Sequence, residues 1–231
     1  MNANAEQPFL AIFDHDGVLI DSLEMHQQAW IELGRQTGLP ITNAFIHETF
    51  GMTNPSIFRK LLGEDLAPAE LTRLSDIKES CYRETARGKI VLMDGVQELL
   101  DTLTALGIRI AIGSSGVLPN LLLTVDSCGL QGRFAAIASL EDITHGKPDP
   151  EVFLKAAAKS GVAPERAVVF EDALVGVQAA KAAGMYAVGV GSTHSLESLL
   201  SAGADQAVPN LVNYPVEALL ETLRARSLST R

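Results

Sequence analysis

The sequence predicts an α/β fold: a doubly wound parallel sheet with helices on both faces, interrupted by an inserted all-helical domain. Short apolar runs alternate with helical patterns over most of the chain, which is typical of parallel strands joined by helices. Residues 23–89 break this alternation, because they contain helical patterns and no convincing strand. We therefore expect a discontinuous core domain, residues 1–22 and 90–231, and a helical domain, residues 23–89.

The first strand ends in two carboxylates. Phe9–Phe13 is apolar throughout, as in a fully buried strand, and Asp14, Asp16 and Gly17 follow it. In extended backbone, residues i and i+2 point to the same side, so both carboxylates are expected to face one small volume. Two anions there repel unless a cation joins them or one holds a proton. The alternative is a polar turn after a core strand.

The helical block follows. Ser22 is expected to cap a first helix that begins at Leu23 and ends at Gly38. Further helices are expected over Pro55–Leu62 and Pro68–Ala86, the last with an apolar face.

From Ile90 onward, strands alternate with helices. The expected strands are Ile108–Ile112, Phe134–Ala138, Ala167–Phe170, Tyr186–Val190 and a short one at Ala207 and Val208. The expected helices are Gly95–Leu106, Leu118–Cys128, Pro150–Ser160, Leu174–Ala183, Ser195–Ala202 and Val216–Arg224.

Length, composition and charge limit the possible functions. The chain has 231 residues, 47% of them hydrophobic, and a formal net charge of −10, which argues against a nucleic-acid or anionic-membrane partner. Cys81 and Cys128 suggest no disulfide framework. The polar start lacks the features of a signal peptide, and the apolar run after it is too short to cross a bilayer. We expect a cytoplasmic protein, a monomer or weak homodimer.

Polar side chains follow several of the expected strands. Ligands of open α/β sheets bind outside the carboxyl ends of the strands, so these side chains should converge at one edge. Carboxylates without neighbouring His or Cys favour Mg²⁺, and a lysine with hydroxyl donors beside it suits a phosphoryl group. The residues concerned are Asp14, Asp16, Ser114, Ser115, Lys147, Glu171 and Asp172.

Four sequence pieces resemble the haloacid dehalogenase-like (HAD) hydrolase superfamily, and within it the β-phosphoglucomutase-like phosphatases. That resemblance covers nearly the whole chain and implies a Rossmann-like core with a helical cap domain that closes over the substrate. The pieces, each placed behind an expected strand, are Asp14-His15-Asp16-Gly17-Val18, Ser114, Gly146-Lys147-Pro148-Asp149-Pro150, and Phe170-Glu171-Asp172 followed by Gly176.

The resemblance implies a role for each core residue. Asp14 would be the nucleophile and a metal ligand, and a carboxylate needs no base to attack phosphorus. Asp16 would act as general acid and then general base, with its backbone carbonyl on the metal. Asp172 would be a metal ligand, and Glu171 a direct ligand or a neighbour of one.

The resemblance also assigns the remaining polar residues of the core. Ser114 and Lys147 would hold the transferring phosphoryl oxygens, with Ser115 beside them at the substrate. It further implies a cis peptide bond between Lys147 and Pro148, which is a minority state for such bonds. For Ser114 and Lys147 the alternatives are a turn-forming serine and a solvated loop lysine.

Three residues of the expected cap bear on the substrate. His26 and Lys78 match a histidine and a lysine of the related sugar-phosphate mutases, although each could instead be a structural or solvated helix residue. Asn54 stands where those mutases have the arginine that grips a distal phosphate. A neutral amide is a poor clamp for a dianion, so Asn54 opposes mutase activity.

The resulting prediction is a Mg²⁺-dependent phosphatase acting on a small phosphorylated metabolite, with sugar phosphates as candidates, through an aspartyl-phosphate. The first alternative is a β-phosphoglucomutase-type mutase, and the second is a non-catalytic protein that binds a phosphometabolite. Asp16 argues against a dehalogenase and against a phosphonoacetaldehyde hydrolase. His15, between the two aspartates, replaces a residue that is more often apolar, and the sequence gives it no role.

Overall fold

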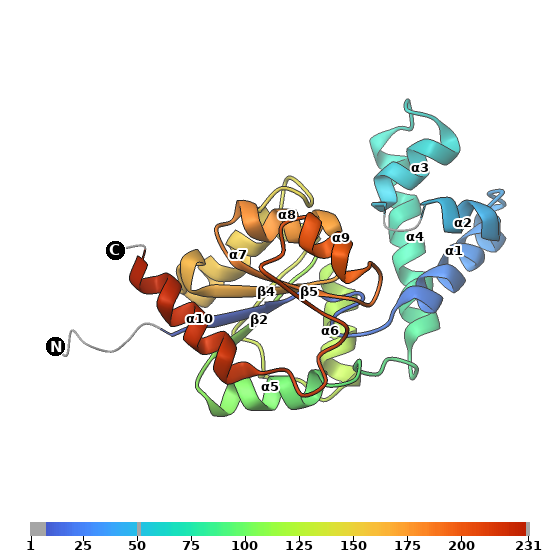
Figure 1. Ribbon diagram of the computed structural model, residues 1–231. Helices are drawn as coiled ribbons and strands as arrows, with labels where there is room; N and C mark the ends of the chain where they lie inside the picture. Colours follow the sequence, from blue (N-terminus) through green and yellow to red (C-terminus); the bar gives the residue numbers. More distant parts are fainter. Residues whose placement is uncertain (1–7, 50–51, 230–231) are drawn as a thin grey trace. The chain divides into compact units, whose positions relative to one another are not determined.

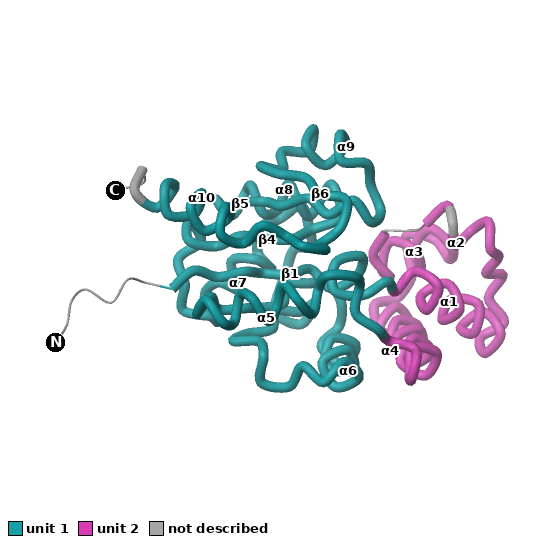
Figure 2. The backbone as a smooth tube through the Cα atoms, turned by 60° about the horizontal axis from the view of Figure 1, so that its bottom comes forward, with its two compact units in different colours: residues 1–21, 91–231 teal, residues 22–90 magenta. Residues whose placement is uncertain are grey.

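The computed structural model describes residues 8–49 and 52–229. The chain divides into two compact units, one formed by residues 1–21 and 91–231 and the other by residues 22–90 (Figure 2). Within the described residues, no helix combines the length and the apolar character that a membrane span requires.

The first unit is built on a six-stranded parallel sheet with the strand order β3-β2-β1-β4-β5-β6 (Figure 1). The predicted α/β class is therefore confirmed. The apolar runs became strands because both faces of the sheet are covered, and the residues of β1 and β4 are all buried. The strands are β1 (Leu10–Phe13), β2 (Arg109–Gly113), β3 (Ala136–Ala138), β4 (Ala167–Glu171), β5 (Tyr186–Val190) and β6 (Gln206–Val208).

Helices pack on both faces of this sheet. α7, α8 and α9 cover one face, where Phe153, Val177 and Leu199 join a core cluster with Leu10 and Ile12 of β1. α5 and α10 cover the other face (Figure 1). The helices are α5 (Val96–Ala105), α6 (Leu118–Ser127), α7 (Glu151–Ser160), α8 (Leu174–Ala182), α9 (Leu196–Ser201) and α10 (Val216–Ser229), with short 3₁₀ turns at Leu140–Asp142 and Pro164–Arg166.

The register of the central strands brings their carboxyl ends level. Phe13 at the end of β1 pairs with Ile112 of β2 on one side and with Phe170 of β4 on the other. Beyond the strand, the Asp14 backbone N–H still donates to the Phe170 carbonyl at 3.0 Å. Residues that follow β1, β2 and β4 therefore start from one edge of the sheet.

The second unit contains helices α1 (Leu23–Thr37), α2 (Asn43–Thr49), α3 (Asn54–Leu62) and α4 (Pro68–Ala86). Its small core gathers buried apolar residues from all four helices, among them Trp30, Ile46, Phe58 and Leu74. α1 is followed by Gly38, which adopts the left-handed conformation expected of a helix C-cap glycine.

In this unit one helix was missed and one predicted helix cap was wrong. α2 was not predicted, because it is short and only Phe45 and Ile46 give it an apolar face. Ser22 occupies the N-cap position of α1, but its side chain makes no capping hydrogen bond. The side-chain cap occurs instead at α3, where Thr53 accepts a hydrogen bond from the Ser56 N–H.

Candidate active site

Three buried carboxylates meet at the carboxyl edge of the sheet. Asp14 follows β1, Glu171 ends β4, and Asp172 comes directly after it. Each offers an oxygen within 4.8 Å of the others, and Glu171 is fully buried. The convergence that the strand pattern predicted for these three residues is present.

Lys147 reaches into this cluster from the loop before α7. Its Nζ lies 2.9 Å from Asp14 Oδ1 and 2.7 Å from Glu171 Oε2. Burial lowers the pKa of Lys147, but Asp14 and Glu171 outweigh burial and raise it well above its usual range, so the ammonium stays charged. The Lys147 Nζ also lies over the ring of Phe153, 4.9 Å from the ring centroid. The predicted cis bond between Lys147 and Pro148 is present.

One ammonium does not balance three carboxylates. Burial and the neighbouring Asp14 raise the pKa of Glu171 to about 8 and that of Asp172 to about 6. Ionisation of these buried carboxylates next to one another is therefore unfavourable unless further positive charge is supplied. A hard divalent cation with oxygen ligands, such as Mg²⁺, fits both the donor set and this requirement.

Asp172 is held by Thr193, which the sequence analysis missed, and it lies against Gly17, which the sequence analysis named for its turn. Thr193, in the loop after β5, lies with its Oγ1 2.6 Å from Asp172 Oδ2 and 3.0 Å from the Asp172 carbonyl. Gly17, with φ +75°, lies under the same carboxylate: a Cβ there would come within 2.1 Å of Asp172 Oδ2. The rule that located Lys147 also applies to the loop after β5, so the position of Thr193 offered a usable signal.

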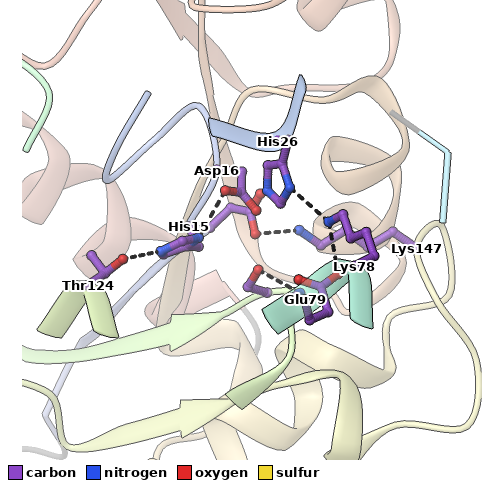
Figure 3. A network of polar contacts seen from close by, with 10 residues as sticks. His15, Asp16, His26, Lys78, Glu79, Thr124 and Lys147 are labelled. Atoms are coloured by element: carbon purple, nitrogen blue, oxygen red, sulfur yellow. Dashed lines mark hydrogen bonds and ion pairs between the residues drawn. The ribbon is translucent and has the colours of Figure 1, made fainter. Parts of the chain in front are cut away.

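The Asp16 carboxylate does not join the three-carboxylate cluster within the described residues. The chain bends at His15, and Asp16 Oδ1 instead lies 3.1 Å from His15 Nδ1 (Figure 3). The Asp16 side chain keeps 39% of its surface exposed, whereas His15 keeps 2%. The expected sharing of one volume by Asp14 and Asp16 assumed extended backbone, and the bend removes that assumption.

The serine loop follows β2. Ser114 is buried, its N–H donates to the Ala138 carbonyl at 3.0 Å, and its Oγ accepts a hydrogen bond from the Gly116 N–H at 3.0 Å. Its hydroxyl proton remains available as a donor. Ser115 is partly exposed.

The three residues singled out in the helical unit form one polar cluster there. Lys78 is 3% exposed, with Nζ 2.9 Å from His26 Nδ1 and 2.9 Å from Glu79 Oε1 (Figure 3). Asn54 Nδ2 donates to the same Glu79 oxygen at 2.6 Å. An ammonium only donates, so His26 Nδ1 accepts, and its ring stacks on Tyr82 with centroids 4.2 Å apart. Glu79 was not foreseen, because neighbouring helix residues do not normally face each other.

Comparison with known proteins agrees with this fold and site. A family model described as haloacid dehalogenase-like hydrolase matches residues 11–190. The chain is 32% identical over 191 residues to the chloroplastic 5-amino-6-(5-phospho-D-ribitylamino)uracil phosphatase of Arabidopsis thaliana, covering 82% of this chain but only 51% of that relative. It is 30% identical to the β-phosphoglucomutase of Bacillus subtilis, covering 91% and 93% of the two chains.

Comparison with solved structures points to the same family. A HAD hydrolase of family IA, variant 3, from Entamoeba histolytica superposes with a TM-score of 0.84 at 26% identity, covering 94% of this chain and 99% of that one. The fold and the edge-clustered carboxylates define a hydrolase with a doubly wound parallel core. The chain belongs to the haloacid dehalogenase-like hydrolase family.

Proposed function

We propose that the protein is a Mg²⁺-dependent phosphatase of small phosphorylated metabolites that works through an aspartyl-phosphate on Asp14. The observation that carries this proposal is the buried Lys147 ammonium, which bridges Asp14 and Glu171 beside Asp172. Phosphoryl transfer by this route needs a nucleophile, a fixed cation and a metal-binding carboxylate within a few ångströms of one another. This cluster contains all three.

Asp14 and Asp172 are the residues that would hold the metal, together with the Asp16 backbone carbonyl. Bound there, Mg²⁺ would supply positive charge beside the phosphoryl oxygens and the charge that develops in the transition state. Glu171 is less suited to direct ligation, because its Oε2 lies against Lys147 and its Oε1 accepts from the Ala173 N–H at 3.0 Å. We assign Glu171 the task of fixing Lys147.

The reaction proceeds in two displacements on this chain's residues. A carboxylate oxygen of Asp14 attacks phosphorus, and the bond to the leaving oxygen breaks while Asp16 gives that oxygen its proton. Asp16, now a carboxylate, takes a proton from a water whose oxygen attacks the aspartyl-phosphate. Phosphate leaves and the Asp14 carboxylate is restored. Lys147 and Ser114 hold the phosphoryl oxygens in both steps, with Ser115 beside them.

We assign substrate choice to the helical unit, acting as a cap domain, through His26, Asn54 and Lys78. The charge of Lys78 is already balanced by Glu79, and Asn54 is committed to that same carboxylate. A cluster of this kind favours the hydroxyl groups of a metabolite with a single phosphate over a second phosphate group. Sugar or sugar-alcohol monophosphates fit, in line with the ribityl phosphate in the name of the Arabidopsis relative. We expect the enzyme to work in the cytoplasm as a monomer or weak homodimer.

The test is phosphate release from a panel of phosphorylated metabolites, with and without Mg²⁺. Wild-type protein is expected to release phosphate only with Mg²⁺, and Asp14→Asn is expected to abolish release. Asp94→Asn, at an exposed aspartate outside the cluster, is the matched control and should retain activity. Release that persists in Asp14→Asn would contradict the assigned nucleophile.

The second candidate, a phosphosugar mutase, rests on the contact between Lys78 and His26 and on the relative from Bacillus subtilis. It is tested by the conversion of β-glucose 1-phosphate with a bisphosphate primer. We expect hydrolysis to dominate because Asn54 offers no charge for a second phosphate. If neither reaction occurs while phosphate esters bind, a non-catalytic binding protein becomes the better description.

A further inference from the structure

We infer that His15 is a positioning residue for Asp16: it ties the proposed acid/base carboxylate to helix α6 through Thr124. This inference rests on the proposed phosphatase function. Its basis is a continuous chain of three side chains within the α/β unit. Asp16 Oδ1 lies 3.1 Å from His15 Nδ1, and His15 Nε2 lies 2.7 Å from Thr124 Oγ1 (Figure 3).

Burial makes this chain rigid. His15 is 1% exposed and Thr124 is fully buried, so neither side chain can exchange its partner for bulk water. Thr124 lies in the last turns of α6, a regular helix of ten residues. The imidazole is thus held at both nitrogens, and only its partner Asp16 has substantial solvent exposure.

The direction of the hydrogen bond between His15 and Asp16 follows from the chemistry of the two groups. An ionised Asp16 only accepts, so His15 Nδ1 carries the proton and donates to it. At Nε2 the Thr124 hydroxyl is a partner for either protonation state of the ring, because a hydroxyl both donates and accepts. An apolar residue at position 15 would fill the same space but would leave Asp16 without this anchor.

The orientation of the Asp16 carboxylate matters because it first donates a proton and later accepts one. In the first step its proton goes to the leaving oxygen as the phosphorus–oxygen bond breaks. In the second it receives a proton from the attacking water. Proton transfer requires the carboxylate within hydrogen-bond reach of each oxygen in turn, and a displacement of about 1 Å costs on the order of a hundredfold in rate. A carboxylate tethered at Oδ1 keeps that reach.

The experiment compares two substrates whose leaving groups differ in their need for a proton. A positioning role affects only the substrate that needs one, whereas a packing role affects both. Phosphoenzyme formation is followed in single turnovers with acetyl phosphate, whose leaving group needs no proton, and with the best alkyl phosphate of the panel. For His15→Leu we expect a fall of roughly 10- to 100-fold with the alkyl phosphate and little change with acetyl phosphate. His15→Asn, which keeps a side-chain N–H donor, should recover most of the alkyl rate. Thr124→Val should lower the same rate by a smaller factor, and Thr124→Ser should not.

The second arm is a double-variant cycle. In an Asp16→Asn background, His15→Leu should have no further effect on phosphoenzyme formation, because the carboxylate that it positions is gone. Equal losses with both substrates, or a full additional loss in the Asp16→Asn background, would overturn the inference and make His15 a packing residue. If the wild-type protein itself forms no phosphoenzyme and releases no phosphate, the proposed phosphatase function is rejected. That outcome differs from a failure of the inference about His15, in which the wild type is active.

Discussion

The Glu171 side chain packs against Gly176 so closely that no side chain fits at position 176. A Cβ placed on Gly176, in the first turn of α8, would lie 2.0 Å from Glu171 Cδ and 2.3 Å from its Oε2. The fully buried carboxylate therefore lies directly against the helix backbone, where it holds Lys147 Nζ at 2.7 Å. The glycine leaves the space that this carboxylate occupies.

Gly176→Ala should accordingly displace Glu171 and loosen Lys147. Alanine improves helix propensity by about 1 kcal/mol, whereas overpacking a buried site costs typically about 1–3 kcal/mol or more. We expect net destabilisation in urea unfolding and a large loss of phosphate release. Gly146→Ala is the control, since a Cβ at Gly146 meets no heavy atom within 4 Å. A Gly176→Ala protein with wild-type stability and turnover would contradict this packing argument.

Without metal, the carboxylate cluster should make the fold less stable as the pH rises. The folded-state pKa values of Glu171 and Asp172, about 8 and about 6, lie above their unfolded values. The folded protein therefore binds more protons between pH ~4 and pH ~8, and stability falls with pH across that range.

The measurement is thermal unfolding in a chelator at several pH values between 4 and 8. Glu171→Gln should flatten the fall, and Mg²⁺ should restore stability at the upper end because it replaces the lost protons. A Glu→Gln change at the exposed Glu84 is the control and should leave the slope unchanged. A metal-free protein whose stability rose toward pH 8 would refute the raised pKa values.

The sequence revealed the part of the site that depends on strand ends. Asp14, Glu171 and Asp172 follow buried apolar runs, and parallel strands bring such positions to one edge whatever the intervening loops do. Lys147 was found in the same way, since its loop follows a strand. The strand pattern was reliable because these residues are buried on both faces, which leaves an uninterrupted apolar signature.

The parts that the sequence did not reveal depend on side-chain directions. His15 contacts Asp16 because the backbone bends after β1, and Glu79 contacts Lys78 although the two are consecutive on α4. Neither contact follows from a period of 2.0 or 3.6 residues. Thr193 follows β5, so its place at this edge of the sheet was predictable. No pattern in the sequence indicates that its hydroxyl contacts Asp172.

Thr193→Val should weaken Mg²⁺ binding. The hydroxyl donates to Asp172 Oδ2 at 2.6 Å and fixes the orientation of this proposed ligand. Loss of such outer contacts typically costs about 10–100-fold in metal affinity. Isothermal titration calorimetry of the metal-free protein with Mg²⁺ measures this affinity independently of turnover. Thr193→Ser retains the hydroxyl and should bind almost normally, whereas equal affinity in all three proteins would show that Asp172 needs no such support.

The last prediction concerns the buried pair in the helical unit. Lys78 and Glu79 expose 4% and 11% of their side chains and approach to 2.9 Å. Burial raises the pKa of Glu79, but Lys78 and Asn54 outweigh burial and the net shift is downward. The pair therefore contributes stability above the unfolded pKa of Glu79, and that contribution is lost as the pH falls through the lower folded value.

Glu79→Gln should leave the Lys78 ammonium buried without its counter-charge. Removal of one partner of a buried pair costs about 3–5 kcal/mol, whereas replacement of both by apolar residues is often neutral. We expect a loss of that size in urea unfolding for Glu79→Gln and recovery in the double variant Lys78→Met/Glu79→Leu. Glu84→Gln on the same helix is the exposed control and should change stability little. A Glu79→Gln protein as stable as the Glu84→Gln control would mean that His26 and the neighbouring rings of Trp30 and Tyr82 suffice to hold the ammonium.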